Sequence, residues 1–326
     1  MVKGMTCLLA VDSGGTKCEA ILATSQGAIL GYGRTDLSTS EIRSDYRGLG
    51  RADETILATL RKVVNPNLRV DELHFCGVRP GLLESLSEWS CPIICHSIRE
   101  QDGPMALASV PHGILALAGT GAFAYGRAPS GDELLLDGIG PLYGDHGGAF
   151  QIGLAGVRAS GRSHWHSQFK TELEHEIPKA CRAILGEPDT FSMVEFMLMP
   201  HDRSVIASLA KVVNNLASSG DLISHRILLE AADDMVETIL CVARSLWFAD
   251  TASTLVGAGS VIVHSNIYWE RICDRMRQEL PNFEPKRVME PQVMGLLRAM
   301  ATQMNIDTKI FRPLLQRQTL PKLAHE

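Results

Sequence analysis

The sequence predicts an α/β protein of two lobes, each built on a mixed sheet. Its 326 residues suit about two domains of roughly 150 residues each. Strand and helix patterns alternate in the first third, which is typical of a partly parallel sheet. A second set of strand patterns begins at Gly113 and repeats the first. We therefore expect an N-terminal domain over residues 1–110 and a C-terminal domain over residues 111–326.

The first domain is predicted to have the order β-β-β-α-β-α-β. Apolar residues at helical spacing from Ser44 to Val64, ended by Asn65-Pro66, indicate its first helix. Short apolar runs predict the strands, and the opening hairpins make the sheet a mixed one. The strands are expected at 7–11, 18–24, 28–33, 73–78 and 92–95, with a short helix at 82–89.

The second domain opens with three further strand patterns, at 114–118, 123–126 and 133–137. Helical patterns then dominate up to Phe248, and a strand at 253–256 and a helix at 268–280 follow. The last helix is expected to pack back on the N-terminal domain. The long helix from Asp221 to Trp247 has an apolar stripe that we expect to face the core. The stripe consists of Leu222, Ile223, Ile227, Ala231, Met235, Ile239, Val242 and Leu246.

Three of the predicted strands end in glycine-rich turns. These are Asp12-Ser-Gly-Gly-Thr-Lys17, Ala118-Gly-Thr-Gly121 and Leu255-Val-Gly-Ala-Gly-Ser260. Glycine lets backbone N–H groups approach an anion, and a threonine hydroxyl adds a donor. Taken alone, the first turn is equally well explained as a hairpin turn with a solvated aspartate. Three such turns in one chain favour a phosphate and metal site.

Composition excludes several classes of function. A net charge of −6 provides no basic surface for nucleic acid. No apolar run reaches the roughly 18 residues of a membrane helix, and the first eleven residues are too short in apolar content for a secretory signal, so we expect a cytoplasmic protein without membrane contact. The eight cysteines are scattered, and Cys91 and Cys95 form the only close pair, which argues against a metal cluster.

Together these motifs resemble the actin–sugar kinase–Hsp70 superfamily, and within it the BadF/BadG/BcrA/BcrD-type ATPases that include N-acetylglucosamine and glucosamine kinases. Three more segments carry the resemblance in the right order: Gly144-Asp-His-Gly-Gly-Ala149, Ala217-Ser-Ser-Gly-Asp221 and Glu290-Pro-Gln-Val-Met-Gly295. The resemblance implies two ribonuclease-H-like domains flanking a nucleotide cleft, with ATP and Mg²⁺ as cofactors.

The resemblance also assigns the nucleotide and metal ligands. Asp12 is expected to hold Mg²⁺ through its water shell, because magnesium gives up water reluctantly. Lys17 could add positive charge, although a solvated side chain is an alternative at an exposed turn. The residues expected to bind the nucleotide are Ser13, Gly14, Gly15, Thr16 and Lys17 of the first turn, Gly119, Thr120 and Gly121 of the second, and Gly257, Ala258 and Gly259 of the third.

Asp102 is predicted to be the general base that accepts the proton of the attacking hydroxyl. It follows a predicted strand and precedes a helix, and members of the family carry an aspartate there. Its alternative role is to cap that helix. The sugar is expected to contact Ser40, Gly77, Asp145 and His146. For Asp145, capping a helix near Ala149 is the alternative.

Three positions depart from the pattern of the amino-sugar kinases. Ser40 stands where those kinases have Asn, Ile139 where they commonly have Trp, and His146 where they have Glu. The departures leave the identity of the sugar open. Arg79, beside Gly77, is either a surface residue or a contact to an anionic substituent.

The predicted function is ATP-dependent phosphorylation of a hydroxyl of an amino sugar, N-acetylglucosamine-like or glucosamine-like, or of a related hexose. Two other classes stay open. One is an iron–sulfur activator of 2-hydroxyacyl-CoA dehydratases or benzoyl-CoA reductases, disfavoured because Ala122-Phe-Ala-Tyr125 lacks a cysteine after the second turn. The other is a non-catalytic ATP-binding sensor. Whether the protein forms a homodimer is also open.

Overall fold

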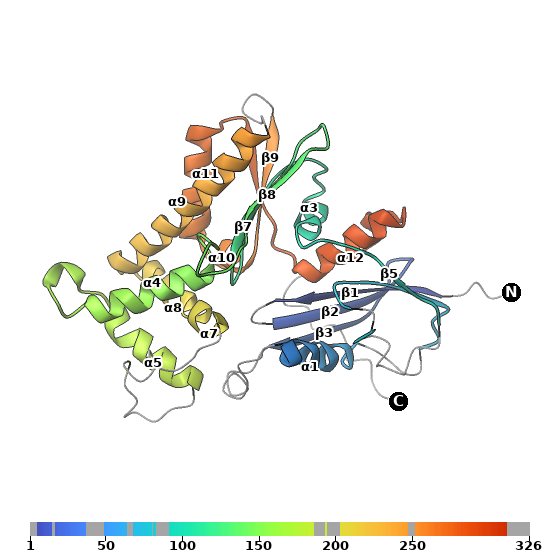
Figure 1. Ribbon diagram of the computed structural model, residues 1–326, viewed down its shortest axis with the longest axis horizontal. Coiled ribbons are helices and arrows are strands. Elements are labelled where there is room, and N and C mark those ends of the chain that lie inside the picture. Colours follow the sequence, from blue (N-terminus) through green and yellow to red (C-terminus); the bar gives the residue numbers. More distant parts are fainter. Residues whose placement is uncertain are drawn as a thin grey trace. The chain divides into compact units, whose positions relative to one another are not determined.

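The computed structural model describes residues 5–14, 17–36, 49–63, 68–79, 81–82, 91–185, 193, 203–246 and 252–311. They form two compact units (Figure 1). Unit 1 contains the described residues up to Val110 and those from Met289 onward, and unit 2 contains Pro111–Val288.

The sheet of unit 1 has the strand order β3-β2-β1-β4-β5. Strands β1 to β3 form an antiparallel meander, while β4 and β5 join it parallel to β1. The bounds are β1 (Thr6–Ser13), β2 (Lys17–Thr24), β3 (Ile29–Asp36), β4 (Glu72–Cys76) and β5 (Ile93–Cys95). This mixed sheet confirms the predicted class of fold.

Both faces of β1 are covered, because successive side chains of a strand point to opposite sides. On one face Leu9 packs with Leu60 of α1 (Leu49–Leu60). On the other face Leu8 packs with Leu297 of α12 (Gln292–Gln303). Figure 1 shows the two helices on opposite sides of the sheet. The helix that carries Asp102, α3 (Asp102–Ala108), packs in turn against α12.

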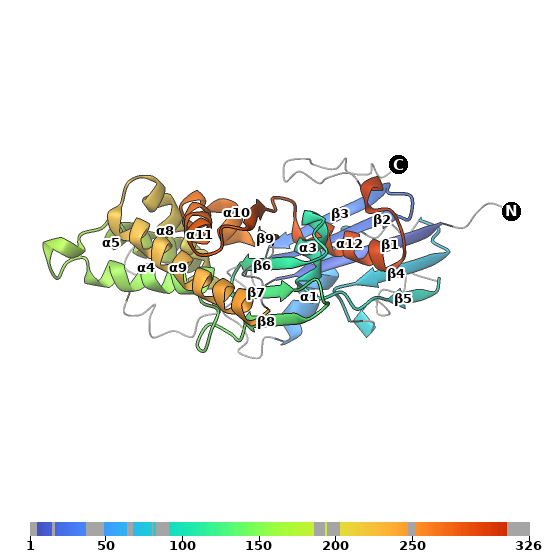
Figure 2. The same cartoon turned by 90° about the horizontal axis from the view of Figure 1, so that it is seen from above.

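Unit 2 repeats the topology of unit 1. Its strand order β10-β9-β6-β7-β8 again places an antiparallel meander beside two parallel strands. Figure 2 shows β6, β7 and β8 side by side. The bounds are β6 (Gly113–Ala118), β7 (Ala122–Arg127), β8 (Glu133–Asp137), β9 (Ser253–Ala258) and β10 (Phe283–Arg287).

A large helical layer packs on the sheet of unit 2 and forms one apolar core with it. The long helix α9 runs through this core, and Asp221 caps its first turn by accepting a hydrogen bond from the Ser224 N–H at 2.7 Å. The described helices of unit 2 are α4 (Ala149–Arg162), α5 (Leu173–Leu185), α7 (Arg203–Ser208), α8 (Ala210–Ser218), α9 (Leu222–Ser245), α10 (Ser260–His264) and α11 (Asn266–Glu279). A 3₁₀ turn at Ser167–Phe169 lies in unit 2 and another at Thr308–Ile310 in unit 1.

The structure corrects the sequence prediction at several points. Strand β10 was not expected, because Phe-Glu-Pro-Lys-Arg lacks a regular apolar pattern and its conformation depends on pairing with β9. The strand at 92–95 was expected to be buried, but β5 is an edge strand with Ile94 and Cys95 exposed. Leu222 is exposed rather than part of the core stripe.

The first predicted helix is described only from Leu49, and residues 61–63 form a turn. The predicted helix at 82–89 lies almost entirely outside the described residues. Over the part of the chain that is described, no helix has the length and apolar character needed to cross a membrane.

Two glycines of α4 allow a test of its packing. A Cβ at buried Gly153 would overlap the backbone carbonyl of Ile206, whereas a Cβ at exposed Gly161 would meet nothing within 4 Å. Gly153→Ala should lower the free energy of unfolding by about 1–3 kcal/mol through overpacking. Gly161→Ala should raise it by about 0.5–1 kcal/mol, because alanine favours a helix. Denaturation midpoints of both variants measure this, and equal midpoints would contradict the close contact of α4 with α7.

Candidate functional site

The second and third glycine turns lie at the same edge of the unit 2 sheet. Strands β6 and β9 are parallel neighbours, with Leu117 paired to Ala258, so both strands end together. Gly259 follows with a φ of +93°, and a Cβ there would overlap the backbone of Ala118. Glycine is therefore required at this position for the two turns to approach each other. Gly257 and Ala258 belong to β9 itself, and Gly257 makes room for the ring of Trp269.

The second turn is attached to the start of α4. The N–H of Gly119 donates to the carbonyl of Gly121 at 2.9 Å, which closes the turn. The carbonyls of Gly119 and Thr120 accept hydrogen bonds from the N–H groups of Ala149 and Phe150 at 2.9 and 3.1 Å. A Cβ at Gly119 would meet only open space. One side of the turn is thus held by the helix while Gly119 stays accessible to a ligand.

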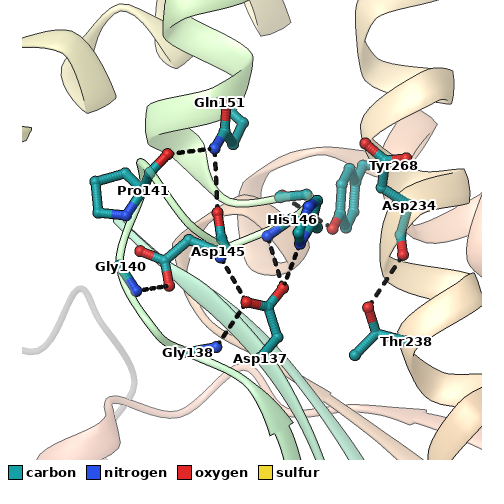
Figure 3. Close-up of polar contacts among 12 residues, drawn as sticks. Asp137, Gly138, Gly140, Pro141, Asp145, His146, Gln151, Asp234, Thr238 and Tyr268 are labelled. Atoms are coloured by element: carbon teal, nitrogen blue, oxygen red, sulfur yellow. Dashed lines mark hydrogen bonds and ion pairs between the residues drawn. The ribbon is translucent and has the colours of Figure 1, made fainter.

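Asp145 lies directly on the second turn. Its side chain is buried, and a Cβ at Gly121 would come within 2.6 Å of its carboxylate. The Gly140 N–H donates to Asp145 Oδ1 at 3.3 Å (Figure 3). The backbone of Asp145 is left-handed, with a φ of +57°. The alternative role of helix cap is wrong, because Gly148 occupies the cap position of α4 and no side chain caps it.

A residue that sequence reasoning missed, Asp137, supports this segment. Its carboxylate accepts hydrogen bonds from the N–H groups of Asp145 and His146 and from the His146 ring (Figure 3). Burial raises its pKa, but the hydrogen bonds from His146 and Asp145 outweigh burial, so the pKa lies below its usual range. The Asp-Gly-Ile-Gly sequence at the end of a strand was the available signal, and it shows a turn without showing which donors the aspartate accepts.

His146 faces an open cavity of about 370 Å³. Acidic side chains dominate its polar lining. The lining residues are Leu136, Asp137, Ile139, His146, Asp234, Glu237, Thr238 and Cys241. Behind His146, the hydroxyl of buried Tyr268 donates to the carbonyl of Gly147 at 3.0 Å, which fixes the backbone after His146.

In unit 1, Asp12 stands at the end of β1, paired with Glu19 of β2. The pKa of Asp12 is raised to about 6, mainly by burial, while Lys17 lowers it and Glu19 and Glu100 add to the rise. Among the described residues, no group donates a hydrogen bond to this carboxylate. A half-buried carboxylate without a donor suits a cation, and Mg²⁺ in particular needs only one or two protein carboxylates beside water and phosphate oxygens. The described residues contain no group of three or more His, Cys, Asp or Glu side chains able to hold a metal by themselves.

The rest of the first turn is only partly described. Ser13 and Gly14 are exposed, and the Gly14 N–H donates to the Lys17 carbonyl at 2.9 Å. Gly15 and Thr16, predicted to bind the nucleotide, lie outside the described residues, and so does Ser40, predicted to contact the sugar.

The ammonium of Lys17 forms an ion pair with buried Glu19, which also accepts a hydrogen bond from Tyr32 at 2.5 Å. The charge of Lys17 thus compensates a buried carboxylate of its own strand. The ion pair with Glu19 gives the charge of Lys17 a partner without a phosphate.

Gly77, which was predicted to contact the sugar, has a φ of +81°, and its backbone lies so close to the carbonyl of Val11 that no Cβ fits.

Comparison with known proteins identifies the family. Residues 9–295 match the model of the BadF/BadG/BcrA/BcrD ATPase family. The chain belongs to this family.

Two curated relatives of this chain are named as kinases. An N-acetylmuramic acid/N-acetylglucosamine kinase of Clostridium acetobutylicum is 31% identical over 82% of this chain and 89% of its own length. An N-acetyl-D-glucosamine kinase of Dictyostelium discoideum is 24% identical over 85% of this chain and 92% of its own. A solved structure from Porphyromonas gingivalis, provisionally named an N-acetylglucosamine kinase, shares the fold with a TM-score of 0.61 at 15% identity, covering 91% of this chain and 99% of that one.

In unit 1, Asp102 is the first residue of α3, and Gln101 is the cap residue. The Asp102 carboxylate accepts hydrogen bonds from Arg99, from its backbone N–H at 3.0 Å, from Nε at 3.1 Å and from Nη2 at 3.0 Å. The predicted alternative, that Asp102 only caps the helix, is wrong. Arg99 instead fixes the orientation of its carboxylate.

The closing motif of the family pattern positions α3. A Cβ at Gly295 would lie 2.5 Å from the carbonyl of Gly103, so α12 and α3 touch backbone to backbone. Gln292 also donates to the carbonyl of Glu100 at 2.8 Å. The motif at 290–295 therefore acts on the helix that carries Asp102.

The raised pKa of Asp12 has a measurable consequence. Folding raises it from the ordinary value of 3.8 to about 6, so the folded protein binds this proton more tightly than the unfolded chain. The contribution of Asp12 to stability is full below about pH 4 and is lost as the pH rises through about 6. Without Mg²⁺ and nucleotide, Asp12→Asn should be more stable than the wild type above about pH 7, and the two should converge toward about pH 4.

Denaturation midpoints across this pH range measure the effect. The exposed turn residue Asp132 provides the control, since Asp132→Asn should not follow the same course. A difference in stability between Asp12→Asn and the wild type that widens on acidification would contradict the raised pKa of Asp12.

Proposed function

We propose that the protein is an ATP-dependent sugar kinase that transfers the γ-phosphate of ATP to a hydroxyl of an amino sugar, N-acetylglucosamine-like or glucosamine-like, or of a related hexose. The observation that carries the proposal is the meeting of the second and third glycine turns at one sheet edge, with Asp145 lying against Gly121. The names of the two curated relatives support it, because each matches more than four fifths of this chain.

Phosphoryl transfer needs fixed phosphates, charge neutralisation and an acceptor for the proton of the hydroxyl. The backbone N–H groups of the glycine turns would hold the phosphates, with Gly119 offering open space for their approach. Asp12 would hold Mg²⁺, which supplies positive charge to the phosphate oxygens when bound. Lys17 is left out of this scheme because Glu19 takes its charge.

Asp102 would take the proton from the sugar hydroxyl as the oxygen–phosphorus bond forms. Its ion pair and hydrogen bonds with Arg99 hold the carboxylate in one orientation. Asp145 would bind a sugar hydroxyl, and its burial against Gly121 would bring that sugar close to the second phosphate turn.

Replacing Asp102 with Asn should lower kcat by about 10²–10⁴-fold, the usual value of general-base assistance. ATP affinity should stay close to that of the wild type. Asp36→Asn is a matched control, because Asp36 is also an aspartate paired with an arginine, Arg34, in unit 1. Steady-state kinetics and ATP titration of both variants distinguish a catalytic effect from loss of an ion pair. Equal kcat values for Asp102→Asn and Asp36→Asn would contradict the role of Asp102.

Measurement of ADP release in the presence of individual sugars tests the function as a whole. N-acetylglucosamine, glucosamine, N-acetylmuramic acid and glucose form the first set. We expect at least one neutral or amino sugar to stimulate turnover in the presence of Mg²⁺. Tight ATP binding without stimulation by any sugar would instead favour the non-catalytic ATP-binding sensor.

A further inference from the structure

We propose that Asp137 is a positioning residue of the sugar site, which holds Asp145 in its binding geometry without touching the substrate. The inference rests on the proposed function and adds a residue to it. Asp137 ends β8, and its side chain is only 6% exposed. It has no place in the motifs from which the function was inferred.

The carboxylate of Asp137 is saturated by donors of its own chain. Oδ1 accepts hydrogen bonds from the N–H groups of Gly138 and Asp145 at 2.9 and 2.6 Å. Oδ2 accepts hydrogen bonds from the His146 N–H at 2.8 Å and from His146 Nδ1 at 2.9 Å. A carboxylate offers about four acceptor positions, so none remains for a substrate. Asp137 therefore acts through the loop and not on the sugar.

The backbone around Asp137 is bent at a conformational cost. Asp137, Gly138 and Asp145 all have positive φ, at 71°, 74° and 57°. A left-handed conformation costs a non-glycine residue roughly 1–2 kcal/mol, so the surroundings have to enforce it. Gly144 lacks the Cβ that would overlap Asp137 Oδ1, which lets the returning chain come close enough to donate. The hydrogen bonds to Asp137 offset the cost and fix the two halves of the loop to each other.

The loop fixed in this way carries both sides of the candidate sugar site. The Asp145 carboxylate accepts a hydrogen bond from the Gly140 N–H and lies against Gly121, so the path of the loop determines its position. His146 is held by its ring N–H and lines the cavity with the carboxylates of Asp234 and Glu237. If Asp137 no longer accepted these hydrogen bonds, the side chains of Asp145 and His146 would shift while the second and third glycine turns stayed in place.

Asp137→Asn tests the proposal with a small change of shape. Whichever way the amide is oriented, an NH₂ group replaces one oxygen and faces two N–H donors. We expect KM for the sugar to rise about 10- to 100-fold, with KM for ATP within about twofold of the wild type. A general loss of folding would change both constants together, so the split between them, with unfolding temperatures, separates positioning from stability.

A double-mutant cycle with Asp145→Ala tests whether Asp137 acts through Asp145. We expect the effects of the two substitutions on sugar binding to be clearly less than additive, because Asp145, the main group that Asp137 positions, is already gone. Additive effects of the two substitutions would overturn the proposal. Asp132→Asn is the control, since this exposed aspartate lies in the turn before β8 and its carboxylate accepts a hydrogen bond from the Ser130 hydroxyl at 2.7 Å, away from Asp145 and His146.

Two further outcomes are distinguishable. If Asp137→Asn does not fold, His146→Ala removes one donor from Asp137 and should raise the sugar KM by about 2- to 5-fold, with unchanged ATP KM; no rise would overturn the proposal. If the wild type neither turns over nor binds any sugar by calorimetry, the proposed function and this inference fail together. A wild type that works normally beside an Asp137→Asn variant with wild-type sugar KM overturns the inference alone.

Discussion

Each unit depends on a central strand whose two faces are both buried. Strand β1 lies between its antiparallel partner β2 and its parallel partner β4, and β6 lies in the same way between β7 and β9. Such a strand has no free edge and no solvent face, so its register is set by hydrogen bonds and packing together. The second turn follows directly on Ala118 and is also attached to the start of α4, so under the proposed function its backbone would hold a charged ligand in one place.

Three aspartates of the two units stand in three different electrostatic environments. Asp12 is half-buried, no described residue donates to its carboxylate, and its pKa rises. Asp137 is surrounded by N–H groups, and its pKa falls. Asp102 is paired with Arg99. The same side chain thus suits a metal ligand, a structural acceptor or a base, depending on which donors the fold provides.

Close approach between backbone segments recurs near the candidate functional residues of each unit. Gly259 lets the third turn reach the end of β6, Gly295 lets α12 touch α3, and Gly144 lets the loop reach Asp137. In each case a Cβ would collide with backbone or with a carboxylate that cannot move cheaply. The glycine motifs therefore serve packing as well as their proposed role in ligand approach, and Gly257 makes room for the ring of Trp269.

The sequence by itself determined the class of fold, most of the strands and the family. Local apolar periodicity and glycine turns express these features directly, since a buried strand must be apolar and a tight turn needs glycine. It also pointed to Asp102 and Asp145, although it left open whether each only capped a helix. It gave no indication of β10, whose residues form a strand only because β9 supplies the partner. Only the tertiary structure decided that Lys17 forms an ion pair with Glu19 and that Asp137 accepts a hydrogen bond from the Asp145 N–H. These contacts depend on how the side chains lie in the strand and on a loop that returns to the end of β8. Side-chain partners of that kind leave no local pattern in a sequence.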